Sequence, residues 1–172
     1  MGRGPRAGLW QQSGPRSRSG YRARGRRRQV ARTFRGEGVH KVDGKGRVSI
    51  PAAFRRVLES NDPDWTEGLN PSLVLVYGDA RWNHIEGYHM AAMADLDARI
   101  AALPRGSRSR RLLEKLFSGQ ALPSQVDENG RIVLPQRLRD KIGLKGEALF
   151  IATGDTFQIW EPGRWAEREA EM

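Results

Sequence analysis

Two arginines, each placed four residues after an aspartate, are the side chains of this chain best suited to bind a ligand. The pattern Asp-x-x-Gly-Arg occurs at residues 43–47 and again at residues 127–131. Aspartate accepts backbone N–H bonds and glycine tolerates a positive φ, so both segments are predicted to form tight turns. An arginine fork held by its aspartate can reach a phosphate or the edge of a guanine. The pattern therefore predicts a binding site that is present twice.

The same residues also have a purely structural interpretation. Each aspartate–arginine pair could stiffen its own turn and bind nothing, because exposed ion pairs and turn-forming residues are common. The duplication favours binding. At matching tip positions the first turn has Lys45, a cation, and the second has Asn129, whose amide can pair with adenine.

The two turns belong to a longer internal repeat. Residues 42–58 align with residues 126–142 without a gap, at a constant offset of 84. Valine, aspartate, glycine, proline and two arginines are identical, and the apolar positions exchange only among Val, Ile, Leu and Phe. Neither copy is long enough to bury a core alone, so we expect two halves that pack into one pseudo-symmetric body.

Each half is predicted to contain a β-hairpin, a short helix and a second β-hairpin. Alternating polar and apolar residues, turn residues and a proline at the first helical position indicate this order. In the first half the expected elements are strands over 39–42 and 47–50, a helix over 52–58, and strands over 73–77 and 83–86. In the second half they are a strand over 131–134, a helix over 135–142, and strands over 148–153 and 156–160.

Two further helices are expected between the halves. Apolar residues recur at helical spacing from Tyr88 to Leu103, and a second apolar stripe follows Ser109, which we expect to cap its helix. Such stripes usually face a core, although in a barrel-like body they can pack against a neighbouring subunit. The predicted fold class is mainly β with helices (α+β). Its expected parts are a disordered tail over 1–33, a first unit over 37–87, connecting helices over 88–118 and a second unit over 119–163.

Charge is distributed unevenly along the chain. The formal net charge is +10, but residues 1–33 contain ten arginines and no acidic residue. The rest of the chain holds 20 basic and 20 acidic side chains, so the predicted folded part is neutral. The tail has three interpretations: a basic arm that contacts phosphates, a targeting peptide, or a segment outside the mature protein, since Val30 is compatible with an alternative start codon.

The sequence lacks the features of several functional classes. It has no cysteine for a disulfide or a thiolate site, and no run of 18 apolar residues. It has no phosphate-binding loop and no dinucleotide fingerprint. The aspartates lack the following hydroxyl residue that supports an aspartic-protease dyad, and His84 and His89 lack a third metal ligand. We therefore expect no enzyme activity, no cofactor, no metal, no small-molecule substrate and no membrane partner.

Three sequence features together resemble the MraZ family. They are Phe34-Arg35-Gly36-Glu37 before the first strand, the signature V-D-x-x-G-R-[VI]-x-[IL]-P in two copies, and the closing Phe157-x-Ile159-Trp160. The family belongs to the SpoVT-AbrB superfamily, so the resemblance implies swapped-hairpin units that pair into a small, double-psi-like β-barrel. It further implies a cytoplasmic, nucleoid-associated transcriptional regulator. Such a protein would bind repeated G-rich boxes in double-stranded promoter DNA as a homo-oligomeric ring and repress the division and cell-wall gene cluster, its own gene included.

The family's Asp-x-x-x-Arg motif falls on both turns of this sequence. The resemblance implies that the following residues contact or position DNA: Lys41, Asp43, Lys45, Arg47, Asp127, Asn129 and Arg131. The second turn departs from the basic form of the first because it carries Glu128, so the first turn is expected to dominate. Two alternatives remain: an oligomeric scaffold whose arginine-rich arm binds RNA without specificity, and a toxin–antitoxin antidote of the same superfamily.

Overall fold

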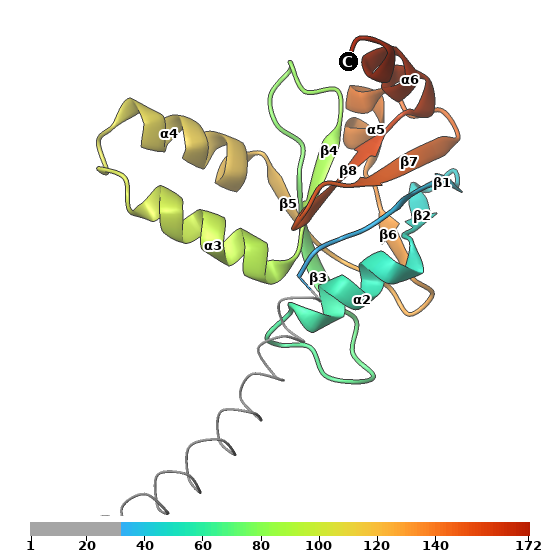
Figure 1. Ribbon diagram of the computed structural model, residues 1–172, viewed down its shortest axis with the longest axis horizontal. Helices are drawn as coiled ribbons and strands as arrows, with labels where there is room; N and C mark the ends of the chain where they lie inside the picture. Colours follow the sequence, from blue (N-terminus) through green and yellow to red (C-terminus); the bar gives the residue numbers. More distant parts are fainter. Residues whose placement is uncertain (1–31) are drawn as a thin grey trace, which may run out of the picture.

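The computed structural model describes residues 32–172, which form an α+β body with one helical hairpin extending from it (Figure 1). The strands are β1 (Glu37–Lys41), β2 (Arg47–Ser49), β3 (Ser72–Val76), β4 (Ile85–Tyr88), β5 (Ala121–Gln125), β6 (Arg131–Val133), β7 (Glu147–Ala152) and β8 (Thr156–Trp160). The helices are α2 (Ala52–Ser60), α3 (Met90–Ala101), α4 (Arg108–Glu114), the π-helical turn η1 (Lys115–Gly119), α5 (Gln136–Ile142) and α6 (Pro162–Ala170). The predicted α+β class is therefore confirmed.

The two halves of the chain exchange strands. One sheet has six strands in the order β1-β7-β8-β4-β3-β5, and a second has only β2 and β6. Strand β1 of the first half pairs with β7 of the second, while β5 of the second half pairs with β3 of the first. The strand order reads the same when the halves are interchanged. This pairing explains why neither copy of the repeat needs a core of its own.

The core lies between the large sheet, the β2–β6 pair and the helices that follow it. Pro51, predicted as the first helical residue, lies one position earlier, at the N-cap of α2, and Phe54, Val57 and Leu58 lie buried on one face of that helix. In α5 the buried residues are Leu138 and Ile142, at the positions equivalent to Phe54 and Leu58. The ring of Phe34 packs 5.2 Å from Phe54 and 5.2 Å from Phe157, between centroids. The segment directly before β1 thus packs into the same core through Phe34.

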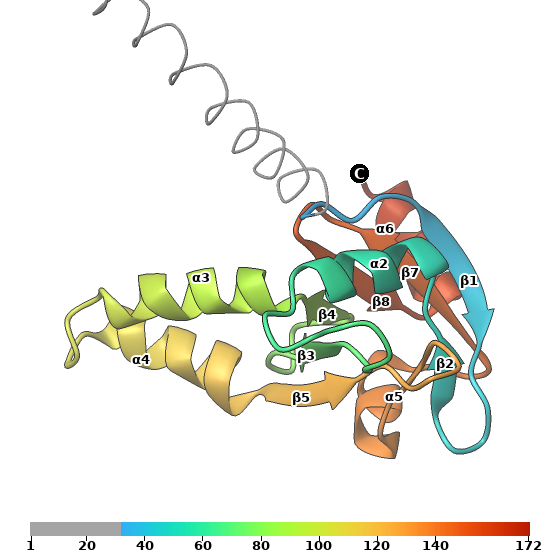
Figure 2. The same ribbon diagram turned by 90° about the horizontal axis from the view of Figure 1, so that it is seen from below.

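Helices α3 and α4 form a hairpin that projects away from the body, at the end opposite to β2 and β6 (Figures 1 and 2). Met93 and Ile100 of α3 are buried, but α4 and η1 bury no residue completely, and Leu112 is 51% exposed. The apolar stripe of the second helix is therefore only partly covered by this chain. The cap predicted at Ser109 is wrong: Ser107 caps α4, its hydroxyl accepting the N–H of Arg110 at 3.2 Å.

Two elements of the structure had no residue range in the sequence prediction. Strand β5 contains Pro123, which a strand tolerates at the edge of a sheet, and β5 is the last strand of the six. Helix α6 starts with the cap of Glu161 and with Pro162 at its first position. The predicted strand over 83–86 and the helix from Tyr88 each begin two residues later in the structure. The predicted tail, apart from its last two residues, lies outside the described part, and the unit boundaries stay predictions.

Candidate nucleic-acid interface

The first Asp-x-x-Gly-Arg turn is held by its aspartate. Asp43 Oδ1 accepts the backbone N–H groups of Lys45 and Arg47, both at 2.9 Å, and its Oδ2 accepts Arg47 Nε at 2.7 Å. Gly46 closes the turn with a φ of +83°, and a Cβ there would lie 2.2 Å from the carbonyl oxygen of Leu134. Only glycine fits this position without a shift of the backbone.

The second turn repeats this arrangement. Asp127 Oδ1 accepts the N–H groups of Asn129 at 2.8 Å and Arg131 at 2.9 Å, and Oδ2 accepts Arg131 Nε at 3.2 Å. Gly130 has a φ of +77°, although a Cβ there would meet no atom within 4 Å. The repeat is therefore reproduced at the level of single hydrogen bonds, with a tighter surrounding for the first turn than for the second.

Both aspartates are stabilised as carboxylates. The backbone N–H of Arg47 is the main cause that lowers the pKa of Asp43 to about 2, and the pKa of Asp127 is lowered chiefly by the N–H of Arg131. Each carboxylate is therefore ionised at neutral pH and pairs with its own arginine. This arrangement differs from a catalytic dyad, in which two carboxylates share one proton.

The structure brings the two arginines onto one face of a β-ribbon. In the antiparallel pairing of β2 with β6, Arg47 lies opposite Val133, Val48 opposite Ile132, and Ser49 opposite Arg131. Val48 and Ile132 are buried, so the residues before and after them point outward. Arg47 and Arg131 are thus diagonal neighbours on the outer face, with about 7–8 Å expected between such positions.

The arginine forks remain available beyond their aspartates. The side chains of Arg47 and Arg131 are 39% and 32% exposed, and within residues 32–172 their side-chain bonds use only Nε. The outer Nη groups can therefore donate to an acceptor outside the chain. A two-stranded β-ribbon is narrow enough to enter the major groove of B-DNA, where arginine pairs with O6 and N7 of guanine.

The remaining predicted residues surround these turns unequally. Lys45 and Asn129 are exposed at the tips, as expected from the repeat, and Lys41 is exposed at the end of β1, opposite Glu147 in the register of the sheet. Within its own segment, residues 41–47, the first turn carries three cations and one carboxylate. The equivalent segment of the second turn, residues 125–131, carries one cation and two carboxylates. This imbalance favours the first turn as the dominant one, which stays a prediction.

Sequence reasoning missed residues that brace the turns from behind. Arg55 of α2 donates from Nη1 to the carbonyl oxygen of Asp127 at 2.7 Å and pairs through Nε with Glu59 at 3.1 Å. Its repeat equivalent, Arg139, donates to the carbonyl oxygen of Leu134 at 2.8 Å. Their identity in the alignment was a signal, but the strand exchange that brings Arg55 to the opposite half was not visible in it.

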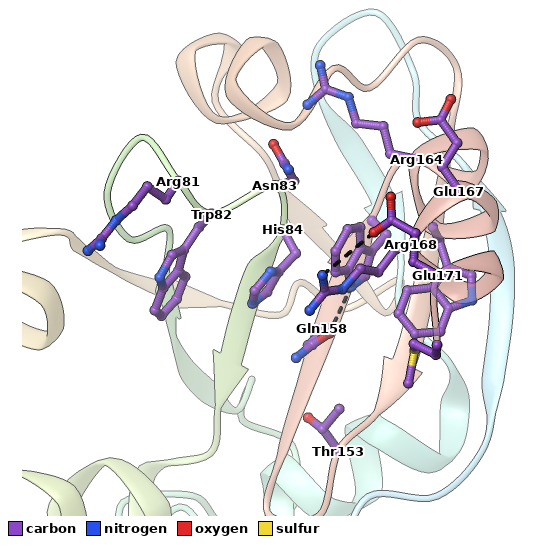
Figure 3. Close-up of a pocket in the computed structure, with 13 residues that line it drawn as sticks. Arg81, Trp82, Asn83, His84, Thr153, Gln158, Arg164, Glu167, Arg168 and Glu171 are labelled. Carbon is purple, nitrogen blue, oxygen red and sulfur yellow. Dashed lines mark hydrogen bonds and ion pairs between the residues drawn. The ribbon is translucent and has the colours of Figure 1, made fainter.

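A separate cavity of about 620 Å³ lies between α6 and the segment that leads into β4 (Figure 3). Here the ring of His84 stacks between Trp82 and Trp160, with centroids 5.1 and 5.0 Å away. His89 lies elsewhere: it is fully buried, caps α3 through Nδ1, and contacts the carbonyl oxygen of Arg32 through Nε2 at 3.0 Å. The two histidines thus have separate structural contacts, and within the described residues no group of three potential metal ligands occurs.

Within residues 32–172, no helix combines the length and the apolar character needed to cross a membrane.

Comparison with known proteins places the chain in a family. A family model described as “MraZ protein, putative antitoxin-like” matches residues 33–103 and 117–172. A protein of Ruegeria sp. (strain TM1040) named “Transcriptional regulator MraZ” is 61% identical over 140 residues, or 81% of this chain and 84% of the relative. Proteins of the same name are 59% identical over 140 residues in Ruegeria pomeroyi, with the same coverage, and 32% identical over 132 residues in Acetivibrio thermocellus, covering 77% of this chain and 83% of that protein. This chain belongs to the MraZ family.

Proposed function

We propose that this protein is a sequence-specific DNA-binding transcriptional regulator. The observation that carries the proposal is the placement of Arg47 and Arg131 on one outer face of the β2–β6 ribbon, each oriented by an ionised aspartate. The relatives named as transcriptional regulators support it, since they match the chain across both turns.

In this proposal the ribbon enters the major groove and each arginine donates to the edge of a guanine. Asp43 and Asp127 orient the forks and do not contact the bases. Lys41 and Lys45 add phosphate contacts beside the first turn, and Asn129 offers an amide beside the second. Each good arginine–guanine contact is worth about 1–3 kcal/mol of discrimination. Because an ionised carboxylate already orients each arginine, the arginine loses less conformational entropy when it binds DNA.

Residues 34–172 carry no net charge, so one subunit would make few phosphate contacts and bind DNA weakly. Tight binding therefore requires several subunits acting together. We propose a homo-oligomeric ring of swapped-hairpin barrels that aligns several ribbons with repeated G-rich boxes. Binding then gains from effective concentration, and the spacing of the boxes contributes to specificity. The partly exposed apolar side of α4, including Leu112, supports a contact between subunits. The proposed target is the promoter of the division and cell-wall gene cluster, which includes the protein's own gene. The protein would repress this promoter as a cytoplasmic, nucleoid-associated regulator.

The proposal is tested by fluorescence anisotropy with the full chain and the DNA upstream of its own gene. We expect tight binding to DNA with several boxes, much weaker binding to a shuffled sequence, and weaker binding to a single box. Equal affinity for native and shuffled DNA would contradict sequence-specific recognition. Equal affinity for DNA with one box and DNA with several boxes would contradict the proposed ring but not sequence-specific recognition.

The arginine-rich residues 1–33 favour one alternative, in which the arm binds nucleic acid without specificity and the turns are a scaffold. A full-length variant with the ten arginines of this segment replaced by serine separates the two. Under the proposed function it retains its preference for native over shuffled DNA and loses only salt-sensitive background affinity. Under the alternative it loses nucleic-acid binding altogether. The toxin–antitoxin antidote alternative is favoured only by the family model's description as “putative antitoxin-like”, whereas the matching relatives are named as transcriptional regulators.

A further inference from the structure

The outer face of the β2–β6 ribbon carries two residues besides the arginines. Ser49 and Val133 occupy the same position of the repeat, two residues after Arg47 and Arg131, and both are exposed. Val133 is 53% exposed although its neighbours Ile132 and Leu134 are completely buried. An exposed valine is common in strands, but this one lies within the candidate interface.

The strand register gives each arginine a neighbour from the other half of the chain. Leu134 N donates to the carbonyl of Gly46 at 2.8 Å, and Ile50 N donates to that of Gly130 at 2.9 Å. Such bonded positions alternate with non-bonded ones along an antiparallel ladder. Arg47/Val133 and Ser49/Arg131 therefore occupy the non-bonded positions, where Cα atoms approach to about 4.5 Å and side chains are closest.

The face consequently has two rows of different chemistry. One row runs Asp43, Arg47, Val133, and the other runs Asp127, Arg131, Ser49. The backbone geometry of the rows is the same, but the first ends in two methyl groups and the second in a hydroxyl. In the major groove the C5-methyl of thymine is the apolar feature that a methyl group can contact, whereas a hydroxyl bonds to several base edges.

We propose that Val133 is a specificity-determining residue that selects a thymine next to the guanine contacted by Arg47. Ser49 gives the guanine contacted by Arg131 no such neighbour preference. Both halves of the chain therefore contribute to each pair of base-contacting residues, since Arg47 and Val133 come from opposite copies of the repeat. The inference rests on the proposed function, because it names a contact within the same DNA interface.

The test uses full-length protein and two versions of the DNA upstream of its own gene, one with thymine and one with deoxyuridine in place of every thymine. Deoxyuridine removes only the C5-methyl and keeps the base pairing. Loss of one methyl contact corresponds to about fourfold in affinity. We expect the wild type to bind the deoxyuridine DNA more weakly by about fourfold for each ribbon that engages a box, and Val133→Ser to bind both versions equally. Ser49→Val should make the protein more sensitive to the methyl groups than the wild type.

Leu69→Ser is the matched control, because Leu69 is 53% exposed but lies in the loop before β3. It should keep the wild-type response to deoxyuridine. An equal response of wild type and Val133→Ser overturns the inference and leaves the proposed function standing. A wild type that binds both DNA versions equally overturns it even if Val133→Ser does not fold. If Val133→Ser changes the oligomeric mass but not the response to deoxyuridine, Val133 belongs to a subunit contact and the inference is overturned. If the wild type binds native DNA no better than shuffled DNA, the proposed function is overturned as well.

Discussion

The two Asp-x-x-Gly-Arg turns have the same hydrogen bonds and different surroundings. In both, one carboxylate accepts two backbone N–H groups and the Nε of an arginine, at distances between 2.7 and 3.2 Å. The first turn, however, presses Gly46 against the carbonyl of Leu134 and carries Lys45, whereas Gly130 faces open space beside Glu128. The comparison separates two roles of the motif: aspartate, glycine and arginine determine the shape, and the tip residues determine the charge.

The largest difference is expected between two glycine substitutions. Gly46→Ala places a methyl 2.2 Å from a backbone oxygen at positive φ, whereas Gly130→Ala meets only the positive φ. The strain of a left-handed alanine is about 1–2 kcal/mol, so Gly130→Ala should cost about this much of the free energy of unfolding. Gly46→Ala should cost roughly 3 kcal/mol or more, because the backbone must also move. Urea unfolding of both variants checks this, and equal costs would show that the first turn is no tighter than the second.

The next difference concerns DNA affinity. Arg47→Ala should lose about 2–3 kcal/mol of specific binding, near the upper end for an arginine–guanine contact, because three cations support its turn. Arg131→Ala should lose about 1 kcal/mol, since its own turn segment, residues 125–131, holds two carboxylates and a single cation. Titrations of native and shuffled DNA with each variant measure the two losses. Equal losses would contradict the dominance of the first turn.

Exchanging the tip residues should shift binding by a smaller amount. Lys45→Asn removes one phosphate contact per subunit, so the slope of log affinity against log salt concentration should become shallower by about 1 for each bound subunit. Asn129→Lys should make the slope steeper by a similar amount. A salt series with Lys45→Asn distinguishes a phosphate contact from base recognition, because the preference of this variant for native over shuffled DNA should stay unchanged. A change in that preference would instead assign Lys45 to a base contact.

The smallest effect is a dependence of stability on acid. The pKa of Asp43 is lowered in the folded state, so its carboxylate stabilises the fold above its ordinary pKa of 3.8, and this contribution is lost as the pH falls from about 4 toward about 2. Asp127 acts in the same direction. We expect the unfolding free energy of the wild type to fall more over this range than that of Asp43→Asn. Parallel curves for both proteins would show that the turn contributes nothing to the acid response.

Local features of the chain were predictable where short-range patterns determine them. The start of α2 after Pro51 and the span of β8 follow from proline placement and strand alternation, and the structure reproduces both. The prediction failed at α4 because Ser107 and Ser109 are both good caps, and two residues of spacing do not distinguish them. Strand β5 escaped because Pro123 in its centre is typical of a loop, and its place at a sheet edge depends on strands far along the chain.

The candidate site shows the same division. Both turns and their tips were predicted from the repeat, since each lies within five consecutive residues. The meeting of Arg47 and Arg131 on one ribbon was not, because the pairing of β2 with β6 joins segments 84 residues apart. The same long-range register brings Val133 beside Arg47 and Arg55 to the second turn. The neighbouring sequence of such residues does not indicate which distant strand they pair with.

The central claim is that the two arginines of the ribbon read DNA, and the double variant Arg47→Ala/Arg131→Ala tests it most directly. Anisotropy titrations of wild type and variant, with the DNA upstream of the gene and its shuffled control, should be carried out over a range of salt concentrations. The account predicts that the variant keeps its fold and oligomeric mass and binds native DNA no better than shuffled DNA. A double variant that still prefers native DNA as strongly as the wild type would contradict the account, since the turns would then be scaffold.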